Sequence, residues 1–189
     1  GLTTFCDTAE ANVRTLYEHN EVVYCVAGNK FGSINSGGTF AQLGSNLSTS
    51  SGFAKIVSIT GAADNNNQLV IIDGTNGYTY NVGTSTATFP ISDVDFIDTC
   101  TDITTQDDYV ITEASGSMNF YLSNVSDATS WAALDFASKF RQPDRLVAVQ
   151  SHKGELWLMG SKTIEIWTNT GNASFPFERR SDVLIEYGL

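Results

Sequence analysis

The apolar residues of this 189-residue chain recur in pairs of short runs. Four times, an apolar run is followed by a turn that contains Gly or Ser, and then by a second run of alternating or aromatic residues. Paired runs of this kind, bounded by turn residues, are typical of β-hairpins. The four predicted hairpins are VVYCVAGNKFGSI (22–34), LVIIDGTNGYTYNV (69–82), YVITEASGSMNFYLSNV (109–125) and LWLMGSKTIEIWTNT (156–170).

The hairpins repeat at a regular period. Their turns, taken at Gly28, Gly74, Gly116 and Gly160, are 46, 42 and 44 residues apart. A further apolar stretch precedes each hairpin, so the repeating unit contains three or four strands. These stretches are NVRTLYE near residue 12, FAKIVSIT at 53, VDFIDTC at 94 and RLVAVQS at 145. A four-stranded unit repeated at about 40 to 50 residues is typical of β-propeller blades.

We therefore predict an all-β, β-propeller-like fold of about four blade-like antiparallel units with a period near 44 residues. The units cover roughly 1–47, 48–90, 91–138 and 139–180. Four blades are few for a closed ring, and the apolar run VLIEYGL reaches the last residue. The segment is therefore expected to be the N-terminal part of a longer chain and of a larger propeller. A β-sandwich has no reason to keep this period, and a β-solenoid would need a shorter one.

One stretch departs from the strand pattern. The segment SDATSWAALDFASKF (126–140) offers Ser126 or Asp127 as a helix N-cap, followed by an Ala-rich run. This arrangement predicts a short helix, which Pro143 would prevent from continuing.

Composition agrees with strands and turns. The chain has 16 Gly, 11 Phe and 7 Tyr but only 16% charged residues, and its apolar runs are far too short for a membrane-spanning helix. The three cysteines lack metal-binding spacing, and Cys25 is expected to be a buried free thiol. We expect no membrane association.

The formal net charge of −11 comes entirely from the middle of the chain. No Lys, Arg or His occurs from Ile56 to Ser138, whereas this stretch contains eleven acids. The remaining residues carry ten acids and ten bases and balance each other. An acidic stretch repels phosphate, which argues against a nucleic-acid-binding surface there. A solvated, solubilising face is the simplest interpretation.

Candidates for catalysis are few. The two histidines, His19 and His152, are expected in polar turns, and no nucleophile elbow, zinc-binding helix or phosphate-binding loop occurs. Two acid pairs have the composition that glycoside hydrolysis requires. Asp93 and Asp95 would lie on one strand face, and the adjacent Asp107 and Asp108 would lie in a turn. Such pairs arise easily in an acidic chain. We predict no catalytic residue, no cofactor and no metal site, so the chain is not expected to be an enzyme.

The sequence offers two other candidate binding sites. Oxygen ligands in ADNNNQ (63–68) are compatible with calcium, but the spacing of an EF-hand is absent and an ordinary Asn-rich loop is the favoured interpretation. Large aromatic residues could form a platform on which sugars stack, but packing between blades is the more common role of such rings. They are Trp131, Trp157, Trp167, Phe175 and Phe177.

The stretch from Phe120 to Arg180 resembles the packaged-DNA stabilisation proteins of short-tailed bacteriophages, which are also called tail hub or head-completion proteins. The resemblance covers about a third of the chain specifically. It is carried in order by Ser123-Asn124, Trp131, Leu134-Asp135-Phe136-Ala137, Pro143-Asp144, Gly160-Ser161, Thr163-Ile164-Glu165-Ile166-Trp167 and Phe175-Pro176-Phe177.

The resemblance implies a virion protein of the phage tail that is built on a propeller-like fold and arranged as a hexameric ring below the portal and its adaptor. There it would act as a nozzle that continues the DNA channel, retains the packaged DNA without binding it specifically, and seats the distal tail needle or fibre. Its expected partners are further copies of itself, the portal-adaptor (head-to-tail connector) proteins and the distal tail proteins.

Under this interpretation, acids of the middle stretch would face the channel and repel DNA, so that it slides without sticking. The residues expected there are Asp93, Asp95, Asp98 and Asp102. The alternative function is a β-propeller module that binds carbohydrate and recognises a receptor through exposed Trp and Asp residues.

Overall fold

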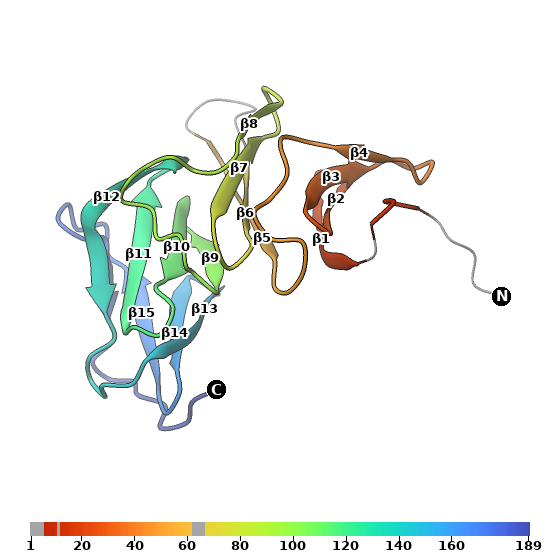
Figure 1. Cartoon of the computed structure of the whole chain (residues 1–189). Helices are drawn as coiled ribbons and strands as arrows, with labels where there is room; N and C mark the ends of the chain where they lie inside the picture. The colour runs from red at the N-terminus through yellow and green to blue at the C-terminus, as the bar shows by residue number, and fades with distance from the viewer. Residues whose placement is uncertain (1–5, 11, 62–66) are drawn as a thin grey trace.

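A computed structural model describes residues 6–10, 12–61 and 67–189. In this part of the chain, all regular elements are β-strands, and they form four sheets of four antiparallel strands each (Figure 1). Within every sheet the strand order is the chain order, so each sheet is one contiguous meander. The all-β prediction of four antiparallel units is confirmed.

The sheets are named blades 1 to 4 in chain order. Blade 1 comprises β1 (Val13–His19), β2 (Val22–Ala27), β3 (Lys30–Ile34) and β4 (Phe40–Gln42). Blade 2 comprises β5 (Lys55–Ile59), β6 (Gln68–Ile72), β7 (Gly77–Asn81) and β8 (Thr86–Thr88). Blade 3 comprises β9 (Ile103–Gln106), β10 (Tyr109–Glu113), β11 (Asn119–Asn124) and β12 (Asp127–Ser138). Blade 4 comprises β13 (Leu146–His152), β14 (Glu155–Gly160), β15 (Ile164–Asn169) and β16 (Phe177–Arg179).

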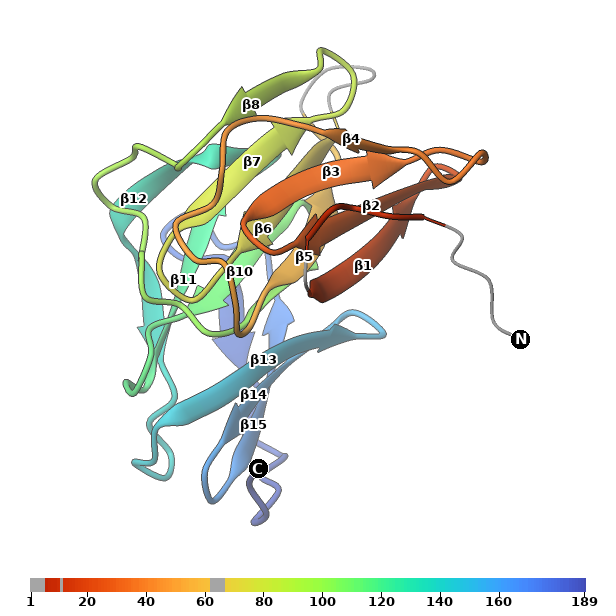
Figure 2. The ribbon, with the colours of Figure 1, turned by 45° about the vertical axis from the view of Figure 1, so that its right-hand side comes forward.

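The first strands of the blades lie side by side. β1 contacts β5, β5 contacts β9, and β9 contacts β13, so these four are the inner strands of an arc. Figure 2 labels β1, β5 and β13, and Figure 1 labels β9 as well. The fourth strands are consequently the outer strands. Three of them, β4, β8 and β16, have 3 residues each, whereas β12 has 12.

Tight turns with positive φ connect the strands. Asn20 and Glu21 join β1 to β2, and Asp107 and Asp108 join β9 to β10, all with φ between 51° and 62°. Two consecutive residues with positive φ form the hairpin turn whose twist matches that of the flanking strands. Asn and Asp tolerate this conformation better than other side chains.

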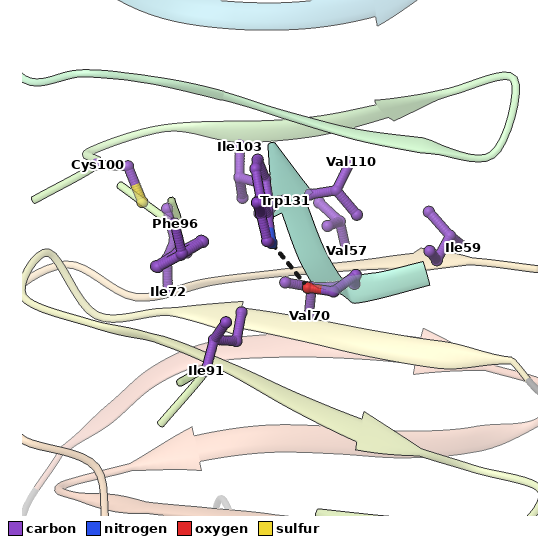
Figure 3. Packing of buried hydrophobic residues seen from close by; sticks show 11 residues of the cluster. Val57, Ile59, Val70, Ile72, Ile91, Phe96, Cys100, Ile103, Val110 and Trp131 are labelled. Atoms are coloured by element: carbon purple, nitrogen blue, oxygen red, sulfur yellow. Dashed lines mark hydrogen bonds between the residues drawn. The ribbon is translucent and has the colours of Figure 1, made fainter. Parts of the chain in front are cut away.

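Apolar side chains fill the spaces between consecutive blades. Sheets bury their faces against each other in this way because each strand alternates its side chains between the two faces. The cluster between blades 2 and 3 is shown in Figure 3, where Val70 and Ile72 of β6 lie near Ile103 and Val110 of blade 3. Equivalent clusters fill the spaces between blades 1 and 2 and between blades 3 and 4.

The short helix predicted for 126–140 is wrong, because Asp127–Ser138 forms β12. Ser126 has a φ of 58° and turns the chain back on β11, where Asp127 pairs with Asn124. The Asp127 carboxylate accepts hydrogen bonds from the backbone N–H and hydroxyl of Thr129, 2.9 and 2.7 Å away, instead of capping a helix. Burial of Trp131 between blades outweighs the helix preference of the neighbouring alanines.

The strand expected at VDFIDTC is also misplaced. Residues 89–102 form an irregular connection, and the inner strand of blade 3 begins at Ile103. Phe96 of this connection packs in the cluster between blades 2 and 3. Ile91, Phe96 and Cys100 therefore belong to the core without belonging to a strand.

Candidate functional site

The inner strands of blades 3 and 4 are joined by side chains of β9 that bond to the backbone of blade 4. The Thr104 hydroxyl accepts a hydrogen bond from Ser151 N at 3.1 Å, and the Gln106 amide donates to the Gly154 carbonyl at 2.9 Å. Asp102, just before β9, accepts from Val149 N at 2.8 Å. Positions 102, 104 and 106 share one face of an extended chain, because side chains alternate along it. Hydrogen bonds from polar side chains therefore link the inner edges of blades 3 and 4.

Asp102 connects three inner strands. Its Oδ2 bonds to β13, while its Oδ1 forms an ion pair with Lys55 Nζ at 2.6 Å, and Lys55 is the first residue of β5. The Asp102 side chain is 13% exposed and that of Lys55 is 31% exposed. The negative charge of Asp102 is thus paired within the protein.

The other three acids expected at the channel lie in the connection 89–102. Asp93 Oδ1 accepts from Asp95 N at 2.9 Å, and Asp93 Oδ2 accepts from Trp131 N at 3.1 Å. Asp93 therefore contacts the outer strand β12, whereas Asp102 contacts inner strands. Asp95 is half-buried and Asp98 is exposed. The expectation that Asp93 and Asp95 share a strand face is wrong, because both lie outside the strands.

Asp107 and Asp108 form a turn, as predicted, and this turn links neighbouring blades. Asp107 Oδ2 accepts from Asn169 Nδ2 of blade 4 at 2.9 Å. Asp108 Oδ1 accepts from Thr60 N, next to blade 2, at 3.2 Å. A polar cavity of about 200 Å³ lies beside them and is also lined by His19 and Asn67. The pair is held by structural hydrogen bonds to two other blades.

In blade 2, the turn between the second and third strands is bonded to the segment that precedes the first strand. Asp73 is 4% exposed and accepts hydrogen bonds from the backbone N–H groups of Thr49, Thr75 and Asn76. The Tyr78 hydroxyl donates to it at 2.9 Å. Desolvation raises the pKa of Asp73, but these hydrogen bonds outweigh it, so the pKa lies below the ordinary value.

The connection between blades 3 and 4 contains a buried ion pair. Lys139 is 0% exposed and forms an ion pair with Asp144, which precedes β13. Asp144 Oδ2 also accepts from Lys162 N and Thr163 N at 2.8 and 3.2 Å, and these groups belong to the turn between β14 and β15. Desolvation raises the pKa of Asp144, while its hydrogen bonds with Lys139, Lys162 and Thr163 lower it below the ordinary value.

In blade 3 as well, an acid at the end of the second strand bonds to the segment that precedes the first strand, but here the acid has no basic partner among the described residues. Glu113, at the end of β10, is 0% exposed, and its Oε1 accepts from Thr101 N at 2.8 Å and from the Thr101 hydroxyl. Its Oε2 is buried without a hydrogen-bond partner among the described residues. Desolvation raises the pKa of Glu113, and the bonds from Thr101 do not cancel this effect. Nothing in the local sequence around Glu113, Asp73 and Asp144 distinguishes these buried acids from solvated ones.

We expect Glu113 to make stability depend on pH. Because its pKa is raised in the folded state, its contribution to stability is fully present below the ordinary pKa of glutamate and is lost as the pH rises through the raised value. Glu113→Gln removes this loss. The free energy of unfolding, measured in urea from about pH 5 to about pH 9, should fall more steeply for the wild type than for the variant.

Asp73→Asn is the matched control for this prediction. The pKa of Asp73 is lowered, so its contribution is present above the ordinary pKa of aspartate and is lost as the pH falls through the lowered value. Removing it should lower stability at neutral pH and leave the slope above neutrality unchanged. Parallel curves for wild type and Glu113→Gln would show that Glu113 is ionised throughout.

The aromatic residues divide into two groups. Trp131, Trp167 and Phe177 are buried between blades, and Phe175 packs against the cluster between blades 3 and 4, so packing is confirmed for these four. Trp157 is half-buried on the free face of blade 4, and its Nε1 is buried without a partner among the described residues. Trp157 borders a cavity of about 230 Å³ with Gln150, His152 and Met159.

The cysteines are free thiols, and Cys25 is buried as expected. Burial raises the pKa of Cys25 to about 11 and that of Cys100 to about 12. Among the described residues, no group of His, Cys, Asp and Glu is arranged to hold a metal ion. The calcium site considered at 63–68 lies mostly outside the described residues. No helix in the described ranges is long and apolar enough to cross a membrane.

Comparison with protein families identifies the chain. Residues 1–189 match the family model described as "Bacteriophage P22 Gp10, beta-propeller", a phage stabilisation family. The chain belongs to the P22 Gp10 family. This confirms the resemblance to phage stabilisation proteins and extends it over the whole length. A comparison with curated proteins finds no match.

Solved structures show the fold of this P22 Gp10 family member independently. A chain of the "Mitotic Checkpoint Complex" has a TM-score of 0.57 at 13% identity, over 92% of this chain and 52% of that one. The extracellular domain of the putative one component system BT4673 from B. thetaiotaomicron has a TM-score of 0.56 at 12% identity, over 95% and 24%. Hsv2 of Kluyvelomyces marxianus has 0.53 at 12%, over 84% and 47%. The P22 Gp10 family member spans about half or less of each of these chains.

Proposed function

We propose that this protein is a structural component of the virion of a short-tailed bacteriophage, where it acts as a tail hub or nozzle and has no catalytic role. The observation that carries the proposal is the match of the whole chain to the P22 Gp10 stabilisation family. The buried acids support it, because they bond to turns and neighbouring blades of their own chain. Hydrogen bonds of this kind make the chain rigid, as a structural protein requires.

In this proposal, six copies form a ring below the portal and its adaptor, and the ring continues the DNA channel, retains the genome and seats the distal needle or fibre. The acidic connection 89–102, which contains Asp93, Asp95, Asp98 and Asp102, faces passing DNA and repels its phosphates. Asp98 is exposed and contributes fully, whereas Asp102 is paired with Lys55 and contributes less. Asp93 and Asp95 belong to the same acidic connection.

We further propose that the natural chain supplies additional blades, the first of which covers Trp157. The third residue of the second strand is Tyr24 in blade 1, Val70 in blade 2 and Ile111 in blade 3, and each is buried against the following blade. Trp157 holds the equivalent position in blade 4. A following blade would complete its burial and offer an acceptor to its indole N–H.

The proposal predicts about six copies of the chain per infectious particle. Quantitative mass spectrometry of purified particles, referenced to the major capsid protein, measures this number. A preparation carried through the same purification from uninfected cells is the control. Absence of the chain from particles would overturn the proposal and favour the carbohydrate-binding alternative, with Trp157, Gln150 and His152 as the first residues to test on a glycan array.

A further inference from the structure

The outer strand of blade 3 leaves its sheet along part of its length. Tyr121 of β11 pairs with Phe136 of β12, and Ser123 pairs with Trp131. Between these two pairs β11 advances by two residues and β12 by five. Residues 132–135 therefore form an outward bulge, which we call the rim bulge. Bulges of this kind redirect side chains away from a sheet.

Both ends of the rim bulge are fixed. At one end, the ring of Trp131 packs on Phe96 with their centres 5.1 Å apart, and its Nε1 donates to the Ala128 carbonyl at 2.9 Å (Figure 3). At the other end, Phe136 stacks on Tyr121 with ring centres 5.5 Å apart. Fixed ends reduce the conformational freedom that a partner would have to restrict on binding.

The rim bulge presents an apolar side chain to solvent. Leu134 is 83% exposed, and Phe136 beside it is 39% exposed. Asp135, between them, lines a cavity of about 290 Å³ together with Val125 and Pro176. A single exposed leucine is ordinary on a protein surface. Here, however, the two exposed apolar residues flank a residue that lines a cavity, and all three belong to one braced segment.

The charge around the rim bulge selects the kind of partner. Asp135 forms no ion pair with any residue in the described ranges, and the cavity that it lines contains no Lys, Arg or His. A complementary surface is therefore basic. A second copy of this chain suits the site poorly, since six of its ten bases already form ion pairs or side-chain hydrogen bonds within the chain. These bases are Arg14, Lys30, Lys55, Lys139, Arg141 and Arg180.

We propose that the rim bulge and Phe136 are a docking site for another virion protein, which presents an apolar pocket edged by Lys or Arg. Leu134 enters the pocket and Asp135 pairs with its basic edge. A few residues that fill well-packed pockets carry most of the binding energy of an interface. The inference rests on the proposed function, because it assumes a virion partner.

The test replaces Leu134 with Asp in the full-length protein produced during infection. We expect at least about tenfold fewer copies per particle than for the wild type. Tyr187→Asp is the control, since Tyr187 is 81% exposed and lies outside both the rim bulge and the acidic connection 89–102. This variant should be incorporated normally. In extracts that support incorporation, Asp135→Asn should weaken the salt dependence of incorporation.

Each other outcome identifies which proposal fails. Equal incorporation of Leu134→Asp and the wild type would overturn the docking site and leave the proposed function intact. Absence of the wild type from particles would instead overturn the proposed function. Sedimentation of the purified full-length proteins tests the partner: loss of self-association in Leu134→Asp would assign the site to a second copy and overturn the inference, whereas an unchanged mass supports it.

Discussion

Replacing Lys139 with Ala is expected to lower the free energy of unfolding by about 3–5 kcal/mol, which is the typical cost of breaking a buried ion pair on one side. Lys139 is 0% exposed, and its Nζ contacts Asp144, the Thr163 hydroxyl at 2.5 Å and the Gln142 carbonyl at 3.4 Å. Without it, Asp144 keeps its bonds to the turn of blade 4 but remains a buried carboxylate without a countercharge. Urea denaturation of the full-length protein measures the loss.

Lys162→Ala is the control, because the Lys162 side chain is exposed and only its backbone N–H bonds to Asp144. Its effect should stay within about 0.5 kcal/mol. Asp144→Asn should be less harmful than Asp144→Ala, since an amide oxygen can still accept from the backbone N–H groups of Lys162 and Thr163. A loss below about 1 kcal/mol for Lys139→Ala would show that the pair is solvated in solution.

Replacing Trp131 with Ala is expected to cost about 3–5 kcal/mol, the usual range for removing a large aromatic side chain from a core. Trp131 is 5% exposed and fills the space between blades 2 and 3, where it packs edge-on against Phe96. Its removal leaves a cavity between two sheets and an Ala128 carbonyl without its indole donor. The midpoint of urea unfolding, multiplied by the dependence of the free energy on urea concentration, gives the free energy of unfolding of each variant.

Trp131→Phe should retain part of the packing and cost less than Trp131→Ala, because only the larger ring and its N–H are lost. Phe96→Ala reports on the same interface from the other side. The double variant should lose less free energy of unfolding than the sum of the losses in Phe96→Ala and Trp131→Ala, since the two rings are in contact. Full additivity would mean that the two rings stabilise the protein separately.

The repeat made the fold predictable, and its exceptions were set by contacts distant in sequence. Hairpins at Gly28, Gly74 and Gly116 could be recognised because apolar runs and turn residues are local signals. β12 could not, since its extended conformation depends on burying Trp131 against Phe96, 35 residues earlier in the chain. The irregular course of residues 89–102 has the same cause, because Ile91, Phe96 and Cys100 of this connection pack between two sheets.

The site was less predictable than the fold. Net charge identified the acidic stretch, but it does not reveal that Asp102 pairs with Lys55 or that Asp93 bonds to the outer strand. Glu113 and Lys139 resemble surface charges in the sequence, and only the packing of blades 3 and 4 places them at 0% exposure. Distances between charges are set by the tertiary structure. Composition therefore predicts the sign of the net charge of a segment, but not which charged side chains pair with each other.

The contiguous meander of each sheet has a consequence for how the protein is made. Every hydrogen-bonded strand pair in the four sheets joins neighbours in the chain, so a blade needs no residue beyond its own fourth strand to complete its ladder. Contacts of short sequence separation form quickly, and repeat units fold against the unit already present. During synthesis, blade 1 can therefore close before blade 2 leaves the ribosome, and each finished blade offers its apolar face as the template on which the next one condenses.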